Sequence, residues 1–285
     1  MSTWPITGCS TGLGRAFAQA ALDRGHHVVV TARDVTKVQD LADKHPDTAL
    51  AVALDVTDDD QVTAAVRAAE DRFGGVDVLV NNAGYGYRAA IEEGGDDAVR
   101  QLFDTHVHGT VRTIKAVLPG MRARRTGTIV NISSIGARVS PEGSGYYSAV
   151  KAAVEALTLS LRKEVAPLGI TALVVEPGAF RTDFAGRSLI QAAVPIDDYA
   201  DTAGRRRKEH DTVHGTQPGD PARAAAALID VVESGKAPYL LPLGNDASDA
   251  IRVTLDALRD DLDAWEGVSR STDLDQDDRD TEAGS

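Results

Sequence analysis

The sequence predicts an α/β fold in which a doubly wound parallel sheet carries helices on both faces. Short apolar runs, of the kind that is buried on both faces of a sheet, alternate with helical segments through most of the chain. This alternation favours right-handed crossovers between parallel strands. No linker rich in Pro, Gly or Ser divides the 285 residues, so a single domain is expected over residues 1–270.

The expected strands are near-continuous apolar runs, at residues 3–7, 27–32, 48–54, 76–81, 127–131, 170–175 and 238–241. Helices are expected between and after them, at residues 13–24, 35–44, 58–73, 97–122, 145–165, 221–232 and 246–265. Asp220 and Pro221 form a typical helix start, because aspartate caps helices and proline is favoured at the first helical position. Pro5 is an exception, because proline removes a ladder hydrogen bond from a central strand. Either that strand begins at Ile6 or the missing donor is harmless.

Charge and composition exclude several kinds of partner. The net charge is −13, and residues 256–285 contribute −8 of it from eleven acids and three arginines. An acidic surface repels nucleic acids and anionic membranes, and no stretch approaches the ~20 apolar residues of a membrane span. The single cysteine, Cys9, fits a reducing compartment, so a cytoplasmic protein is expected. Residues 271–285 are polar with one leucine and are expected to form a flexible acidic tail.

Four motifs follow one another along the chain. They read TGCSTGLG at residues 7–14, NNAG at 81–84, NISS at 131–134 and YSAVK at 147–151. On a helix, Tyr147 and Lys151 share one face. A neighbouring cation favours the phenolate of a tyrosine, whose pKa is ordinarily near ~10, so the pair suits acid/base chemistry.

This combination resembles the short-chain dehydrogenase/reductase family in its single-domain branch, over roughly residues 3–245. Two runs, Ile6–Ser10 and Val175–Phe184, are most similar to hydroxysteroid and retinol dehydrogenases and many bacterial relatives. The resemblance implies a Rossmann-type fold, with no metal site, and hydride transfer between a nicotinamide cofactor and a ketone, an aldehyde or a secondary alcohol.

The resemblance also implies catalytic roles for three residues. Tyr147 would be the general acid in reduction and the general base in oxidation, while Lys151 would lower its pKa and hold the nicotinamide ribose. Ser134 would orient the substrate oxygen. Successive side chains alternate at a strand end, so only one of Ser133 and Ser134 can face the site, and the spacing of thirteen residues to Tyr147 selects Ser134.

Further residues are expected to hold the cofactor. The glycines of the first motif let the backbone approach a pyrophosphate at the positive N-terminal end of the following helix, and the neighbouring hydroxyls can bind phosphate. The resemblance adds residues near the adenine, the nicotinamide and its carboxamide. The expected set is Gly8, Ser10, Thr11, Gly12, Leu13, Gly14, Arg33, Asp55, Val56, Asn81, Ala83, Gly84, Tyr147, Lys151, Pro177, Gly178 and Thr182.

The end of the second strand favours NADP(H) over NAD(H). NAD enzymes usually place an acid there that holds both ribose hydroxyls, whereas this chain has Ala32 followed by Arg33. An arginine fork suits a 2′-phosphate, and alanine removes a carboxylate that would repel it. Asp34 is the counterargument, because it could reach a ribose or could cap the next helix.

One position departs from the family's pattern. The family has asparagine in the pattern F-x-x-N-x-x-G, where it kinks the helix and anchors a water that leads to the lysine. This chain has His106 there. A histidine with a pKa near ~6.5 could carry a proton in its place, so His106 joins the candidate catalytic residues. A non-catalytic nucleotide-binding sensor is an alternative function, and a sugar-nucleotide epimerase fits the glycine pattern and the length less well.

Residues 184–218 are expected to form a lid over a small-molecule substrate, because ligands of doubly wound sheets bind beyond the carboxyl ends of the strands. Apolar residues in this segment, such as Ile190 and Tyr199, favour a hydrophobic substrate. The basic run Arg205–Lys208 is expected to be a solvated helix face rather than an anion site. Relatives commonly pair subunits through the helices expected at 97–122 and 145–165, so a homodimer or homotetramer is expected.

Overall fold

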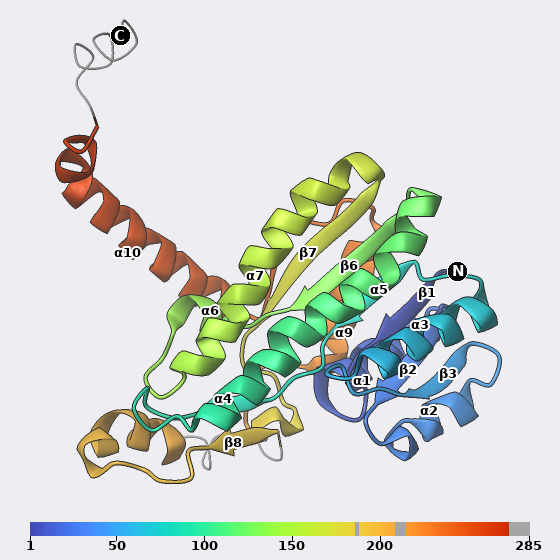
Figure 1. Cartoon of the computed structure of the whole chain (residues 1–285), viewed down its shortest axis with the longest axis horizontal. Coiled ribbons are helices and arrows are strands. Elements are labelled where there is room, and N and C mark those ends of the chain that lie inside the picture. Colours follow the sequence, from blue (N-terminus) through green and yellow to red (C-terminus); the bar gives the residue numbers. More distant parts are fainter. Residues whose placement is uncertain (186–187, 209–214, 274–285) are drawn as a thin grey trace, which may run out of the picture.

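A computed structural model describes residues 1–185, 188–208 and 215–273. Within these ranges, seven parallel strands form one sheet in the order β3-β2-β1-β4-β6-β7-β9. Helices cover both faces of this sheet, and the chain reverses its direction of travel across the sheet between β1 and β4 (Figure 1). The predicted single-domain α/β fold is therefore confirmed.

The elements lie close to their expected positions. The strands of the main sheet are β1 (Thr3–Ile6), β2 (His27–Ala32), β3 (Ala49–Ala53), β4 (Val78–Asn81), β6 (Gly127–Ile132), β7 (Ile170–Pro177) and β9 (Leu240–Leu243). The α-helices are α1 (Gly12–Asp23), α2 (Gln39–Lys44), α3 (Asp59–Phe73), α4 (Asp96–Phe103), α5 (Gly109–Arg124), α6 (Gly136–Val139), α7 (Gly145–Val165), α9 (Pro221–Glu233) and α10 (Asn245–Arg270).

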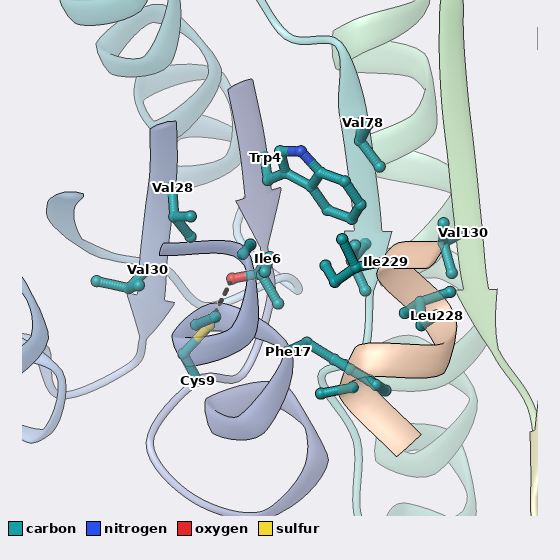
Figure 2. Packing of buried hydrophobic residues seen from close by; sticks show 14 of the residues in the cluster. Trp4, Ile6, Cys9, Phe17, Val28, Val30, Val78, Val130, Leu228 and Ile229 are labelled. Carbon is teal, nitrogen blue, oxygen red and sulfur yellow. Dashed lines mark hydrogen bonds between the residues drawn. The ribbon is translucent and has the colours of Figure 1, made fainter. Parts of the chain in front are cut away.

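Each face of the sheet has its own apolar core. On one face Phe17 of α1 and Leu228 of α9 pack against Ile6 and its neighbouring strands (Figure 2). On the other face, residues of α5 and α7 such as Val117 and Leu161 pack against β4, β6 and β7. Truncating a fully buried side chain of this size costs about 2–5 kcal/mol, so these two layers hold the strand ends, and the loops that follow them, in place.

Cys9 belongs to the first of these cores. Its thiol is fully buried and donates a hydrogen bond to the Ile6 carbonyl at 3.1 Å (Figure 2). Burial raises the pKa of Cys9 to about 12, so the thiolate is not formed at neutral pH. The residue fills the turn after β1.

Pro5 lies inside β1 and not before it. On the side of β4, the Thr3 backbone N–H donates to the Asp77 carboxylate at 2.8 Å, and the Thr7 N–H donates to the Val80 carbonyl at 2.9 Å. Pro5 lies midway between these two donors, so by alternation its missing N–H falls on the β4 side. The pairing of β1 with β4 is accordingly limited to one residue pair, whereas β1 pairs with β2 over four.

Three features were not expected from the sequence. The helix expected at residues 97–122 is divided by a π-helical turn, Asp104–His108, between α4 and α5. Two short strands, β5 (Gly86–Arg88) and β8 (Leu189–Gln191), pair in parallel outside the main sheet. The last helix runs past residue 265 to Arg270 and extends away from the body (Figure 1).

Some expectations fall outside the described residues. Most of the expected acidic tail, residues 274–285, does so, as do residues 186–187 and 209–214 of the expected lid. In the part of the chain that the structure describes, no helix combines the length and the apolarity that crossing a bilayer requires.

Candidate active site

A cleft of about 1290 Å³ lies where the carboxyl ends of the parallel strands meet. Its walls include most of the residues that the sequence indicated, although these come from loops and helices far apart in the chain. The structure brings together Gly8, Ser10, Thr11, Gly12, Leu13, Arg33, Asp55, Val56, Ala83, Gly84, His106, Ser134, Tyr147, Lys151, Pro177, Gly178 and Thr182. Of the expected residues, Gly14 and Asn81 do not line this cleft.

Asn81 holds the sheet together below the cleft. Its side chain is buried, and its amide donates to Asn131 at 2.8 Å while its carbonyl oxygen accepts from Thr113 at 2.6 Å. These bonds join β4 to β6 and to α5. The side chain of Asn81 therefore has a structural role beneath the site.

The next residue, Asn82, holds the glycine loop, and sequence reasoning missed it. Its side-chain amide donates to the carbonyls of Thr7 at 2.9 Å and Gly8 at 3.1 Å. A Cβ at Gly14 would lie 2.3 Å from this amide, so the packing of Asn82 requires glycine at this position. The alternation of side chains along β4 is the signal that separates Asn81 from Asn82.

The glycine loop leaves room for a phosphate. Gly8 and Gly12 have φ values of 72° and 64°, which glycine adopts without strain. Thr11 occupies the N-cap position of α1, but its side chain makes no capping bond there. The N-terminus of α1 therefore presents backbone N–H groups and the positive end of the helix dipole to the cleft, as an anion site requires.

The end of β2 presents an arginine to the cleft. Ala32 is buried at the last position of the strand, and Arg33 is exposed and lines the cleft. Asp34 turns to the next segment, where its carboxylate accepts hydrogen bonds from the Thr36 N–H at 3.1 Å and hydroxyl at 2.6 Å. These bonds lower the pKa of Asp34 and cap a short 3-10 helix, so Asp34 is used as a cap.

Asp55 lines the cleft after β3 and is not the cap of α3. Its Oδ1 accepts bonds from the Thr57 N–H at 2.9 Å and hydroxyl at 2.7 Å. Asp58 caps α3 by accepting from the backbone of Asp60 and Gln61.

Three polar side chains meet at the centre of the cleft. Tyr147 and Lys151 lie one turn apart on the buried side of α7, with the Lys151 ammonium 5.7 Å from the centre of the Tyr147 ring. The Lys151 ammonium donates to the Ile132 carbonyl at 2.8 Å. The hydroxyl of Ser134 hydrogen-bonds to Tyr147, whereas that of Ser133 donates to Glu155 at 2.6 Å.

Burial sets the protonation states of this group. It raises the pKa of Tyr147 to about 12, and the hydrogen bond with Ser134 and the charge of Arg88 lower that pKa. Burial lowers the pKa of Lys151 to about 8, against the charge of Glu155, which raises it. Among the charged side chains of the described residues, Arg88 is the one that lowers the Tyr147 pKa. The sequence indicated Lys151 for this effect. Sequence reasoning missed Arg88, which follows the NNAG motif by only a few residues.

His106 is neutral in this fold, and the expected pKa near ~6.5 is wrong for it. Burial, followed by the charge of Lys151, lowers the His106 pKa well below its usual value. Its Nε2 lies 2.8 Å from the Tyr85 carbonyl oxygen, and its ring stands perpendicular to that of Tyr147 with centroids 5.9 Å apart. Its Nδ1 is buried and has no hydrogen-bond partner among the described residues. The side chain offers a polar nitrogen rather than a charge.

The basic run Arg205–Lys208 is not a uniformly solvated face. Arg207 forms an ion pair with Glu93 at 2.5 Å, and this bond lowers the Glu93 pKa to about 2. Arg205 and Arg206 line the cleft. The expected solvated face is therefore wrong for Arg206 and Arg207, which are half-buried.

Comparison with known proteins agrees with this geometry. A profile of the family described as short chain dehydrogenase matches residues 3–192. The chain belongs to the short-chain dehydrogenase family. As a member of this family, the protein is an oxidoreductase.

Three similar proteins span most of the chain. Oxidoreductase BOA17 of Botryotinia fuckeliana is 36% identical over 267 residues, covering 93% of this chain and 97% of that protein. A 3-ketodihydrosphingosine reductase of Bacteroides thetaiotaomicron is 35% identical over 246 residues, 84% of this chain and 86% of that protein. The crystal structure of a short-chain dehydrogenase from Streptomyces avermitilis has a TM-score of 0.89 at 44% identity and covers 96% of this chain and 100% of that chain.

Proposed function

We propose that this oxidoreductase is NADP(H)-dependent and transfers a hydride between the nicotinamide and a ketone, an aldehyde or a secondary alcohol. The observation that carries the proposal is the meeting of Ser134, Tyr147 and Lys151 in the same cleft as the glycine loop. The similarity to a 3-ketodihydrosphingosine reductase supports ketone reduction. The runs Ile6–Ser10 and Val175–Phe184 support a place in the branch of hydroxysteroid and retinol dehydrogenase-like enzymes.

The residues present fit a dinucleotide. The glycine loop allows close approach, and the N-terminus of α1 would hold the pyrophosphate. Asp55 and Val56 would contact the adenine, Lys151 the nicotinamide ribose, and Thr182 with Pro177 the carboxamide. When bound, the nicotinamide supplies or accepts the hydride.

The protein's own residues manage the proton. Tyr147 is protonated at neutral pH, because its pKa is raised to about 12, and it donates its proton to the substrate oxygen as the carbonyl carbon is reduced. In the reverse direction it takes the proton back. The Ser134 hydroxyl holds the same oxygen in line with Tyr147, and the positive charge of Arg88 favours the phenolate that remains.

Three neighbouring residues support NADP(H) over NAD(H). Arg33 can pair with a 2′-phosphate, and Ala32 leaves no carboxylate to repel it. Asp34, the residue that could have bound a ribose, uses its carboxylate to cap the turn at Thr36.

The segment from Phe184 to Pro218 is proposed as the lid of the substrate site. Phe184 places its ring 5.9 Å from that of Tyr147, and β8 pairs with β5 at the rim of the cleft. Glu93 anchors the segment to the body through Arg207 and by accepting from the Ile196 N–H at 2.9 Å.

The direct test is a panel of ketones, quinones, aldehydes and secondary alcohols, monitored by NADPH absorbance with purified protein. We expect at least one hydrophobic carbonyl to be reduced with NADPH, at a higher kcat/KM than with NADH. Tight NADPH binding without turnover across the whole panel would support the sensor alternative.

A further inference from the structure

Arg88 is a cation at the substrate end of the cleft. It lies at the end of β5, paired with Gln191 of β8, and its side chain lines the cleft with Tyr147 and Ser134. Its Nη1 donates to the hydroxyl of Ser144, the residue that precedes α7. This bond fixes the guanidinium at the start of α7, the helix that carries Tyr147.

The Arg88 guanidinium forms no ion pair with an acid of the described residues. The Arg88 Nε is buried and has no hydrogen-bond partner in the described part of the chain. With Nη1 held by Ser144 and Nε buried, Nη2 is the guanidinium nitrogen left for a ligand in the cleft.

The guanidinium of Arg206 acts on Arg88. Burial lowers the Arg88 pKa, and the charge of Arg206 lowers it further. The group that raises the Arg88 pKa is the phenol of Tyr147, and no carboxylate of residues 1–185, 188–208 and 215–273 does so. Because two guanidinium groups repel each other, an anion bound at Arg88 would be favoured beyond its hydrogen bonds.

The acids that line the cleft do not pair with Arg88. Asp104 pairs with Arg112 at 2.8 Å, and Asp246 accepts from the Ala179 N–H at 2.6 Å. Asp55 bonds to Thr57. Glu142 is exposed to solvent.

An apolar wall lies beside this cation. Val139, Phe184 and Ile190 line the cleft and expose 43%, 37% and 47% of their surface. A ligand that touches both Arg88 and this wall has an anionic group and an apolar chain.

We propose that Arg88 binds a carboxylate of the substrate, so that the enzyme acts on apolar oxo acids, or on the corresponding hydroxy acids, in preference to neutral ketones. This inference rests on the proposed function, since it names the substrate class of the same site. Tyr147 and Ser134 hold the reacting oxygen, and Nη2 of Arg88 holds the carboxylate beside it.

Turnover of matched substrates tests the proposal. The substrates are 2-oxooctanoate and 3-oxooctanoate, each compared with its methyl ester, and the proteins are wild type, Arg88→Gln, Arg88→Lys and a control, Arg100→Gln. Arg100 is exposed on α4, pairs with Asp97 and does not line the cleft. The readout is the ratio of kcat/KM for acid and ester, which cancels any effect of Arg88 on Tyr147 itself.

We expect wild type to prefer at least one acid over its ester by about 10-fold or more. Arg88→Gln should reduce this preference by about 10- to 100-fold, the range expected for losing a charged hydrogen-bond partner. Arg88→Lys should fall between the two because it keeps the charge but loses the bond that positions the guanidinium on Ser144, and Arg100→Gln should match wild type. A preference for the esters, or an unchanged ratio in Arg88→Gln, would overturn the proposal.

A binding measurement separates this proposal from the proposed function. Octanoate and octanamide have no ketone or aldehyde group to be reduced, and each is titrated calorimetrically into NADP-saturated wild type and Arg88→Gln. Octanoate binding that weakens at least 10-fold in Arg88→Gln supports the carboxylate site even if no carbonyl compound of any kind is turned over, in which case the proposed function fails alone. Reduction of neutral ketones, together with equal octanoate binding by both proteins, would refute the carboxylate site and leave the proposed function standing.

Discussion

Replacing Arg33 by alanine should weaken NADPH binding and leave NADH binding almost unchanged. Arg33 lines the cleft at the end of β2, and Asp34 beside it caps the turn at Thr36. The 2′-phosphate is the group that distinguishes the two cofactors. Loss of the arginine should therefore affect the cofactor that carries this group.

The expected size of the effect follows from the exposure of Arg33. A hydrogen bond to a charged group contributes about 1.5–3 kcal/mol, and exposure to solvent places Arg33 at the lower end, about 1.5–2 kcal/mol. This corresponds to about a 10- to 30-fold rise in the Kd for NADPH. The reverse change, Ala32→Asp, should weaken NADPH further and improve NADH, because a carboxylate repels the phosphate and accepts from ribose hydroxyls.

Fluorescence titration of both cofactors into wild type, Arg33→Ala and Ala32→Asp measures these constants. Arg67→Ala is a matched control, because Arg67 is exposed on α3 and does not line the cleft. Equal Kd values for NADPH and NADH in wild type would refute the reasoning, as would an Arg33→Ala variant that loses affinity for both cofactors alike.

Two further predictions concern buried titratable groups. His106→Asn should keep most activity and His106→Leu should lose several-fold more, because leucine has no polar atom beside Tyr147. Since the His106 pKa is far below its usual value, the pH–rate profile of wild type should show no ionisation near pH ~6.5. An ionisation near that pH that disappears in His106→Asn would contradict this expectation. Burial and the neighbouring Glu155 raise the pKa of Glu176 to about 8, so the folded protein holds a proton that the unfolded chain has lost. Stability should therefore fall as the pH rises from about 5 to 8, and Glu176→Gln should flatten this fall in Tm; parallel slopes for the two proteins would show that Glu176 does not cause it.

The parts of the fold that could be predicted depend on local patterns. Buried strands appear as apolar runs whatever lies around them, and a spacing of four residues places Tyr147 and Lys151 on one face of any helix. The strand His27–Ala32 and the helix Gly145–Val165 have the predicted bounds for this reason. Pro5 could not be placed from the sequence, because the ladder bond that it removes depends on which neighbouring strand it faces.

The parts that could not be predicted depend on contacts between distant residues. Arg88, Ser144 and Arg206 meet only after the chain has folded, so no spacing in the sequence joins them. The strands β5 and β8 have three residues each, too few to show a period of two. The pKa of His106 depends on burial, which the residue type does not reveal.

The central claim is that Tyr147 moves the proton in a hydride-transfer reaction. The most direct measurement is the turnover and NADPH affinity of Tyr147→Phe, compared with Tyr146→Phe, whose hydroxyl donates to the Ile91 carbonyl at 2.6 Å. On a substrate that wild type reduces, Tyr147→Phe should lower turnover by about 10²- to 10⁴-fold with NADPH affinity within a few-fold, and Tyr146→Phe should remain near wild type. A Tyr147→Phe variant as active as wild type would contradict the account.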